Sequence, residues 1–247
     1  TQEKLPNLKN MGLVTASTWV DLDGDNWDDL VITGEWMPIR VFKNNAGSFS
    51  EITKQILPND TNGWWFAIEK GDFDNDGDFD LVVGNLGTNY KYQASKEKPF
   101  QIYLNDFDQN AKYDIVLSYS TDDEEYPVRG RQCSSEQMPA IKEKFKNYNS
   151  FAGASLQEIY TNKMLEESLR YKITSFESLY LENDNGILKA ISLPFPALFS
   201  NIYSFVVDDF DYDGNLDVVL GGNLFNSEVE TPRNDASYGL WPVSYTH

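Results

Sequence analysis

The chain has 247 residues, of which 40% are hydrophobic and 14% aromatic, and this composition excludes an intrinsically disordered protein. Its net charge is −19 and it has no cluster of lysines and arginines, which argues against nucleic acid as a partner. One histidine, His247, and one cysteine, Cys133, exclude Ser-His and Cys-His catalysis, histidine-based zinc sites and an internal disulfide. No apolar run approaches the length of a transmembrane segment.

The first part of the chain has the pattern of four β-strands in sequence order. We expect strands at 15–20, 30–34, 39–43 and 48–52, with a hairpin turn at 44–47. Four such strands are what one blade of a propeller requires. Residues 65–69 and 81–84 predict two strands of a second blade. Residues 90–99 contain no convincing strand pair, so we expect the second blade to be poor in strands.

The middle of the chain changes from strand to helix patterns. After expected strands at 101–104, 115–119 and 125–129, Ile141, Phe145 and Tyr148 recur at helical spacing, and Ser155 with Glu158 forms a capping-box motif. We interpret 134–171 as a helical insertion in a single domain spanning 1–247. The insertion is either a structural brace or a lid or docking element. Strands resume at 177–181, 187–191, 203–207 and 218–221.

An acidic nonamer occurs four times, beginning at Asp21, Asp72, Asp106 and Asp209. Counting from this first residue as offset 0, each copy has Asp or Asn at offsets 0, 2 and 4, an apolar residue at offset 1, and Asp at offset 8. Four copies in one frame indicate an internal repeat. Calcium binds six to eight oxygens from carboxylates and carbonyls, so each nonamer predicts a calcium loop in which offset 6 supplies a backbone carbonyl. The predicted metal ligands are Asp21, Asp23, Asp25, Trp27 and Asp29; Asp72, Asp74, Asp76, Asp78 and Asp80; Asp106, Asp108, Asn110, Lys112 and Asp114; and Asp209, Asp211, Asp213, Asn215 and Asp217.

Two alternatives bear on these loops. An EF-hand needs a glutamate at loop position 12 followed by a helix, but that position is Ile32, Val83, Leu117 or Leu220, so an EF-hand is rejected. The other alternative is that the aspartate clusters are solvated turns. In the third loop, Ala111 stands at offset 5, where a left-handed backbone would cost about 1 kcal/mol. We therefore expect up to four Ca²⁺ ions, with the site at 106–114 the weakest.

The nonamers resemble the calcium-binding FG-GAP/VCBS repeats of integrin-α-like β-propellers. Four further stretches are similar to bacterial VCBS-repeat proteins related to the UnbV and cartilage-acidic-protein group: 34–39, 63–65, 84–89, and 221–223 with 233–239. The resemblance implies an all-β fold, namely a β-propeller that closes with about four blades or belongs to a larger ring. It also implies an exported protein, extracellular, on the bacterial cell surface or associated with the outer membrane.

The expected function is that of a non-enzymatic, calcium-stabilised binding or scaffold module in a cell-surface protein assembly. A carbohydrate-binding or carbohydrate-active surface protein is the alternative, so a glycan is a second possible partner. The acidic residues that could catalyse glycoside hydrolysis in such a protein stand in no recognisable motif, so we do not expect an enzyme. Trp36, Trp64 and Trp65 could stack on sugar rings, but core packing is their expected role. The acidic candidates are Glu35, Glu69, Asp122, Asp123, Glu124 and Glu125.

Overall fold

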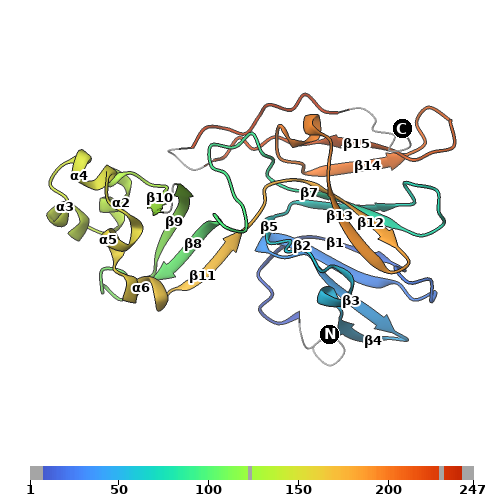
Figure 1. Cartoon of the computed structure of the whole chain (residues 1–247), viewed down its shortest axis with the longest axis horizontal. Helices are drawn as coiled ribbons and strands as arrows, with labels where there is room; N and C mark the ends of the chain where they lie inside the picture. The colour runs from blue at the N-terminus through green and yellow to red at the C-terminus, as the bar shows by residue number, and fades with distance from the viewer. Residues whose placement is uncertain (1–7, 122–123, 228–230, 241–247) are drawn as a thin grey trace. The chain divides into compact units, whose positions relative to one another are not determined.

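The computed structural model describes residues 8–121, 124–227 and 231–240, and these residues are mostly β (Figure 1). They fall into two compact units. Unit 1 holds residues 8–90, 176–227 and 233–240, and unit 2 holds residues 91–175 with 231–232. Most of unit 2 is therefore an insertion into the sequence of unit 1.

The first sheet of unit 1 confirms the four strands predicted for the first part of the chain. Its strands pair antiparallel in sequence order, and β2 is buried along nearly its whole length, which explains its run of apolar residues. The short β5 (Gly63–Trp64) also pairs with β2, and the helix α1 (Thr53–Ile56) follows the sheet. The four strands are β1 (Leu13–Val20), β2 (Asp29–Met37), β3 (Arg40–Asn45) and β4 (Ser48–Glu51).

The second sheet corrects the expectation that the second blade is poor in strands. It has four strands in the same spatial order as the first sheet, but the third and fourth come from the chain after unit 2. Leu81 pairs with Leu181 across one hundred residues of sequence. The expectation was wrong because strand pairing acts through space, and the insertion separates the partners. The strands are β6 (Ala67–Gly71), β7 (Asp80–Gly84), β12 (Leu179–Asp184) and β13 (Ile187–Ser192).

A third sheet in unit 1 consists of β14 (Ser204–Asp208) and β15 (Asp217–Gly221), preceded by the 3₁₀ helix η2 (Phe195–Leu198). The first strands of the three sheets are neighbours, since β6 contacts β1 and also β14. Two apolar clusters fill the space between sheets. Trp65 and Leu181 belong to the cluster shared by the first two sheets, and Phe73 to that shared by the second and third. The core of unit 1 thus lies between successive sheets.

Unit 2 is an antiparallel sheet in the order β10-β9-β8-β11 with short helices packed through an apolar cluster that includes Tyr103, Val116 and Leu156. The predicted capping box is confirmed, because Ser155 and Glu158 exchange hydrogen bonds between side chain and backbone. The strands are β8 (Phe100–Asn105), β9 (Asp114–Thr121), β10 (Glu124–Pro127) and β11 (Leu169–Ile173). The helices are α2 (Arg131–Gln137), α3 (Ala140–Lys144), α4 (Tyr148–Ala152), α5 (Leu156–Tyr160) and α6 (Asn162–Glu166).

The predicted helical span of 134–171 needs correction at both ends. The helices begin at Arg131 and end at Glu166, and residues from Leu169 form β11, which pairs with β8. The apolar residues of β11 recur at every second position and not at helical spacing. Among the described residues the sheets do not close into a ring. The chain is therefore mostly β with a helical segment, while the propeller and the single domain remain predictions.

Candidate metal sites

The four acidic loops share one hydrogen-bond pattern. The backbone N–H at offset 5 donates to the carboxylate at offset 0 over 2.7–3.2 Å. The N–H at offset 6 donates to the side-chain oxygen at offset 4 over 2.8–3.1 Å. The N–H at offset 1 donates to the carboxylate at offset 8 over 3.0–3.4 Å. The repeat seen in the sequence is thus a repeat in three dimensions.

Each loop also has two residues with a left-handed backbone. Offset 5 has a positive φ in all four loops, so the cost considered for alanine at this position applies to Ala111, which adopts φ 66°. Offset 3 has a positive φ as well, which the sequence analysis missed. Glycine and asparagine favour this conformation, but glutamine and tyrosine do not, so no residue type shared by the four loops marks this position. The residues at offset 3 are Gly24, Asn75, Gln109 and Tyr212.

This backbone brings carboxylates together in every loop. In each one, three aspartates offer oxygens that lie within 4.8 Å of one another. Oxygen-only donors of this kind suit a hard divalent cation. The four groups are Asp21, Asp23 and Asp25; Asp72, Asp74 and Asp76; Asp106, Asp108 and Asp114; and Asp209, Asp211 and Asp217.

The loop at 72 provides the test of fit. One carboxylate oxygen of Asp72 and one of Asp78 are buried without a hydrogen-bond partner in the described part of the chain. Burial, followed by the charges of Asp76 and Asp80, raises the pKa of Asp78 to about 6. Burial also raises the pKa of Asp74. Buried carboxylate oxygens without donors are costly, and a bound cation would neutralise them, so these residues fit a metal ion.

The aspartate at offset 8 has a second role that the sequence analysis did not foresee. It is buried in all four loops, with Asp80 completely enclosed. Asp80 accepts hydrogen bonds from the N–H of Phe73 at 3.1 Å, the N–H of Asn183 at 2.8 Å and the hydroxyl of Tyr180 at 2.8 Å. Burial raises the pKa of Asp80 against the lowering effect of these bonds. The aspartate at offset 8 therefore attaches the loop to the sheet through hydrogen bonds.

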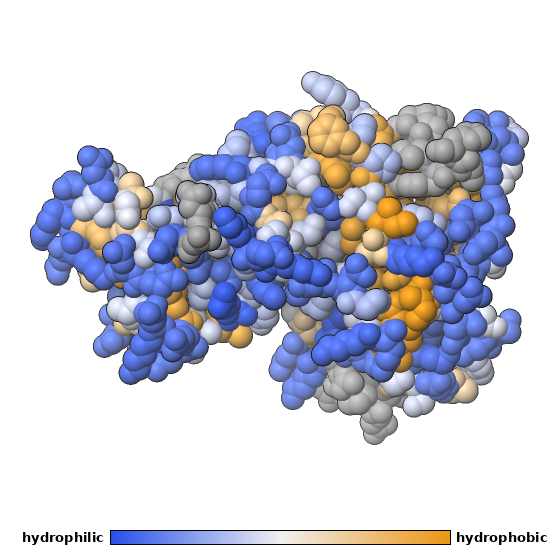
Figure 2. Space-filling view, in the orientation of Figure 1, coloured by the Kyte–Doolittle hydropathy of each residue, from blue (hydrophilic) through white to orange (hydrophobic). Residues whose placement is uncertain are grey.

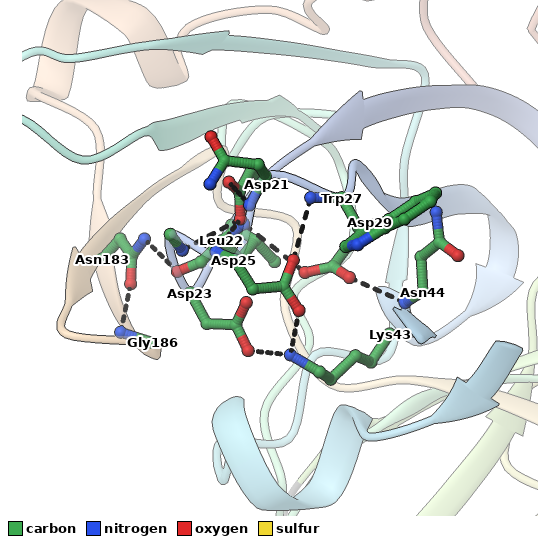
Figure 3. A network of polar contacts seen from close by, with 12 residues as sticks. Asp21, Leu22, Asp23, Asp25, Trp27, Asp29, Lys43, Asn44, Asn183 and Gly186 are labelled. Atoms are coloured by element: carbon green, nitrogen blue, oxygen red, sulfur yellow. Dashed lines mark hydrogen bonds and ion pairs between the residues drawn. The ribbon is translucent and has the colours of Figure 1, made fainter. Parts of the chain in front are cut away.

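A matching asparagine lies in the hairpin beside each of the first two loops. Asn44 lies near the end of β3 and donates its backbone N–H to Asp29 at 2.8 Å, as Asn183 of β12 does to Asp80. Asn183 makes one bond more, because its amide donates to the carbonyl of Leu22 in the neighbouring loop at 2.9 Å (Figure 3). The second sheet is thereby connected to the first loop.

Lys43 places a positive charge beside the first loop. Its ammonium pairs with Asp23 and, at 3.0 Å, with Asp25 (Figure 3). A cation bound at Asp21, Asp23 and Asp25 would compete with this ammonium for the same oxygens. The loop at 21 should therefore bind metal more weakly than its three aspartates alone suggest.

We expect Lys43→Gln to strengthen cation binding in the first loop by about two- to fivefold, since an exposed ion pair contributes up to about 1 kcal/mol. Trp27 lies in this loop and is half exposed, so it can sensitise Tb³⁺ luminescence there. A terbium titration would show a lower midpoint for K43Q, an unchanged midpoint for Lys189→Gln, and no loop signal in Trp27→Phe. An equal midpoint for K43Q and the unmodified protein would show that Lys43 does not compete.

The third loop differs from the others at the positions predicted to weaken it. Asn110 replaces an aspartate at offset 4, and its side-chain oxygen accepts the N–H of Lys112. The residues predicted as carbonyl donors, Trp27, Asp78, Lys112 and Asn215, all lie at offset 6 in the shared turn. Their role as ligands remains a prediction.

We expect Asp74→Ala to remove more calcium-dependent stability than Asp108→Ala, because the third loop begins with fewer carboxylates and a strained Ala111. The comparison requires melting curves of both variants in calcium and in chelator. The difference in melting temperature between calcium and chelator should decrease more in D74A than in D108A. Equal differences in the two variants would contradict the ranking of the sites.

Residues 21–83 match the model of an FG-GAP-like repeat. The matched segment contains the first two loops and the strands between them, and it ends just before the sequence leaves the second sheet for unit 2. A search of the curated proteins finds no match. No helix in the described ranges is long and apolar enough to cross a membrane.

The described residues considered for carbohydrate chemistry lie in strands of three different sheets. Glu35 lies in β2, Glu69 in β6, and Glu124 and Glu125 in β10, while Asp122 and Asp123 lie outside the described residues. Glu125 accepts hydrogen bonds from Gln101, Tyr103 and Ser118. The polar contacts of its carboxylate are thus made within unit 2.

The three tryptophans follow the core-packing expectation for the most part. Trp65 and Trp36 are buried, and Trp64 is half-buried with its ring centroid 5.2 Å from that of Trp36. The indole N–H of Trp65 donates to the carbonyl of Thr61 at 2.9 Å. These rings help to fill unit 1.

Proposed function

We propose that unit 1 is a calcium-stabilised part of a β-propeller, and that the protein is a non-enzymatic binding or scaffold module in an assembly at the outer surface of a bacterial cell. The observation that carries this proposal is the shared geometry of the four loops, each with three aspartates grouped around one point. The FG-GAP-like repeat at 21–83 supports it. So do the three sheets of unit 1 with neighbouring first strands, which is how consecutive blades are arranged.

Calcium is the proposed cation because of the ligand chemistry. The loops offer several carboxylates and backbone carbonyls on a flexible backbone, which suits the variable coordination of Ca²⁺. Mg²⁺ demands a near-octahedral shell and keeps several of its waters. Extracellular calcium modules bind with dissociation constants of about 10⁻⁴–10⁻³ M, which suits an exported protein.

Two features of the surface support a binding role. Phe195 and Phe199 of unit 1 are exposed by 70% and 38% and form a T-shaped pair with centroids 4.8 Å apart. Hydrophilic residues cover much of the face drawn in Figure 2, and a hydrophobic area interrupts them in the right half of the view. Unit 2 is carried between the second and third strands of the second sheet, and such connections on a rigid scaffold often bear binding residues.

The test is surface labelling of producing cells followed by native fractionation. We expect a membrane-impermeant biotin reagent to label the protein on intact cells. We also expect it to migrate in a complex of fixed composition in calcium and to leave that complex in chelator. Labelling only after lysis, or identical migration in both conditions, would contradict the proposal. Turnover of a polysaccharide by the purified protein would contradict its non-enzymatic part.

A further inference from the structure

Unit 2 contains a cavity of about 270 Å³ that none of the metal loops uses. One wall is formed by residues 126–131, which include the end of β10 and the start of α2. The other wall is formed by α4 and Ala154, and Tyr119 of β9 completes the lining. All of these residues belong to unit 2 and to the described ranges, so the cavity is a feature of one compact unit.

The described lining of this cavity carries a charge opposite to that of the chain. The chain has 39 acidic and 20 basic residues, yet the described residues that line the cavity include Arg129 and Arg131 and no aspartate or glutamate. A concave site with charge of one sign concentrates ligands of the opposite sign. The cavity therefore favours an anionic group.

Arg131 is held in position by a hydrogen bond from its Nε and by an aromatic neighbour. Its Nε donates to the carbonyl of Phe145 at 2.6 Å, and its guanidinium carbon lies 5.5 Å from the ring centroid of Tyr148. It forms no ion pair with any described carboxylate. A guanidinium fixed in this way can bind a carboxylate through two parallel hydrogen bonds. Arg129 also lines the cavity and donates to Gln137 at 3.1 Å.

Aromatic rings supply the rest of the lining. Tyr119 and Tyr126 have ring centroids 6.2 Å apart and planes inclined by 34°, and Tyr148 is 62% exposed. Flat rings with hydroxyl groups can pack against the C–H face of a sugar and hydrogen bond to its hydroxyls. Tyr126 also borders a second cavity of about 540 Å³, whose lining includes Glu124 and Glu158 besides polar residues such as Gln157 and Asn162. Because these glutamates would repel a carboxylate, a sugar chain that continues there would do so with uncharged units.

We propose that this cavity binds an acidic saccharide, with Arg131 on the carboxylate of a uronic acid and Tyr148 and Tyr126 against sugar rings. The proposal rests on the binding role given above and names a ligand class for it. An acidic peptide fits less well. Pro127 lies on β10, an edge strand of the sheet, and lacks the N–H that a peptide strand would need for pairing.

The experiment is calorimetry on the full chain at constant free calcium. The probes are a galacturonate trimer, its methyl-esterified form, and a short polyglutamate peptide. We expect the acid trimer to bind and the ester to bind at least tenfold more weakly. Arg131→Gln and Tyr148→Ala should each lower the affinity for the acid trimer at least tenfold. The affinity of Arg131→Lys should lie between that of R131Q and that of the unmodified protein.

The matched control is Lys163→Gln, which removes one positive charge from an exposed residue outside the cavity lining. It should bind the trimer as the unmodified protein does. Equal binding of acid and ester, equal losses in K163Q and R131Q, or displacement of the trimer by polyglutamate would overturn the proposal. Melting curves of each sample in calcium and chelator separate the two claims. A retained calcium effect without trimer binding refutes the saccharide site alone, and loss of both refutes the calcium-stabilised module as well.

Discussion

Replacing Asp80 by alanine is expected to lower the free energy of unfolding by about 3–5 kcal/mol. The carboxylate is completely buried and accepts hydrogen bonds from two backbone N–H groups and from the hydroxyl of Tyr180. Each buried donor left without an acceptor costs about 1–3 kcal/mol. For a chain of this size the loss corresponds to a fall in melting temperature of about 10 °C.

Melting curves in chelator test this prediction, because they isolate the structural role of Asp80 from metal binding. Asp80→Asn keeps one acceptor oxygen and should give an intermediate loss. The control is Asp184→Ala, since Asp184 lies exposed at the end of β12 and pairs with Lys189 at 2.7 Å. This exposed pair should contribute less than about 1 kcal/mol. Similar losses in D80A and D184A would show that the loop is not fastened through offset 8.

Asn183→Ala is expected to lower the free energy of unfolding by about 2–4 kcal/mol, which is the second large effect. The buried amide donates to the carbonyl of Leu22 in the first loop and to that of Phe79 in the second, and its oxygen accepts the N–H of Gly186. The variant breaks all three bonds and leaves polar backbone groups without partners. It also removes a link between two metal loops.

Asn44→Ala is the matched control for that link. Asn44 occupies the equivalent hairpin of the first sheet and makes the corresponding bonds to Asp28 and Gly47, but among the described residues it makes no bond to a neighbouring loop. Chemical denaturation of both variants should therefore show a larger loss for N183A. A loss in N44A as large as that in N183A would mean that the bond to Leu22 contributes nothing measurable.

The sequence predicted the features that depend on local chemistry. The strands of the first sheet, the acidic loops, the capping box at Ser155 and the left-handed residue at offset 5 each follow from residue types a few positions apart. Residues of this kind restrict the backbone conformation or hydrogen bond to a neighbour a few positions away. Their pattern can therefore be recognised in the sequence alone.

The sequence did not predict the features that depend on distant partners. The pairing of β7 with β12 joins segments on either side of unit 2, and no local pattern marks it. Lys43 and Asn183 were missed for the same reason, because each acts on a loop that lies elsewhere in the sequence. The left-handed residue at offset 3 was missed because glutamine and tyrosine, which rarely adopt that conformation, occupy it in two loops.

The same distant contacts connect metal loops within unit 1. Asn183 joins the first and second loops, and the amide of Asn75 donates to the side-chain oxygen of Asn215 at 2.6 Å, which joins the second loop to the fourth. Because each loop brings several like charges together, a cation in any of them would relieve repulsion and stiffen the loop. We therefore expect the stability of unit 1 to depend on divalent cations.

The most direct measurement is a thermal melt in millimolar calcium and again in excess chelator, combined with calorimetric counting of bound ions. One site held at one hundred times its dissociation constant adds about 2.7 kcal/mol. The account predicts three or four bound ions and a large fall in melting temperature when calcium is removed. No bound ion and no change in melting temperature would show that the aspartate loops are solvated turns, and would contradict the calcium-stabilised module.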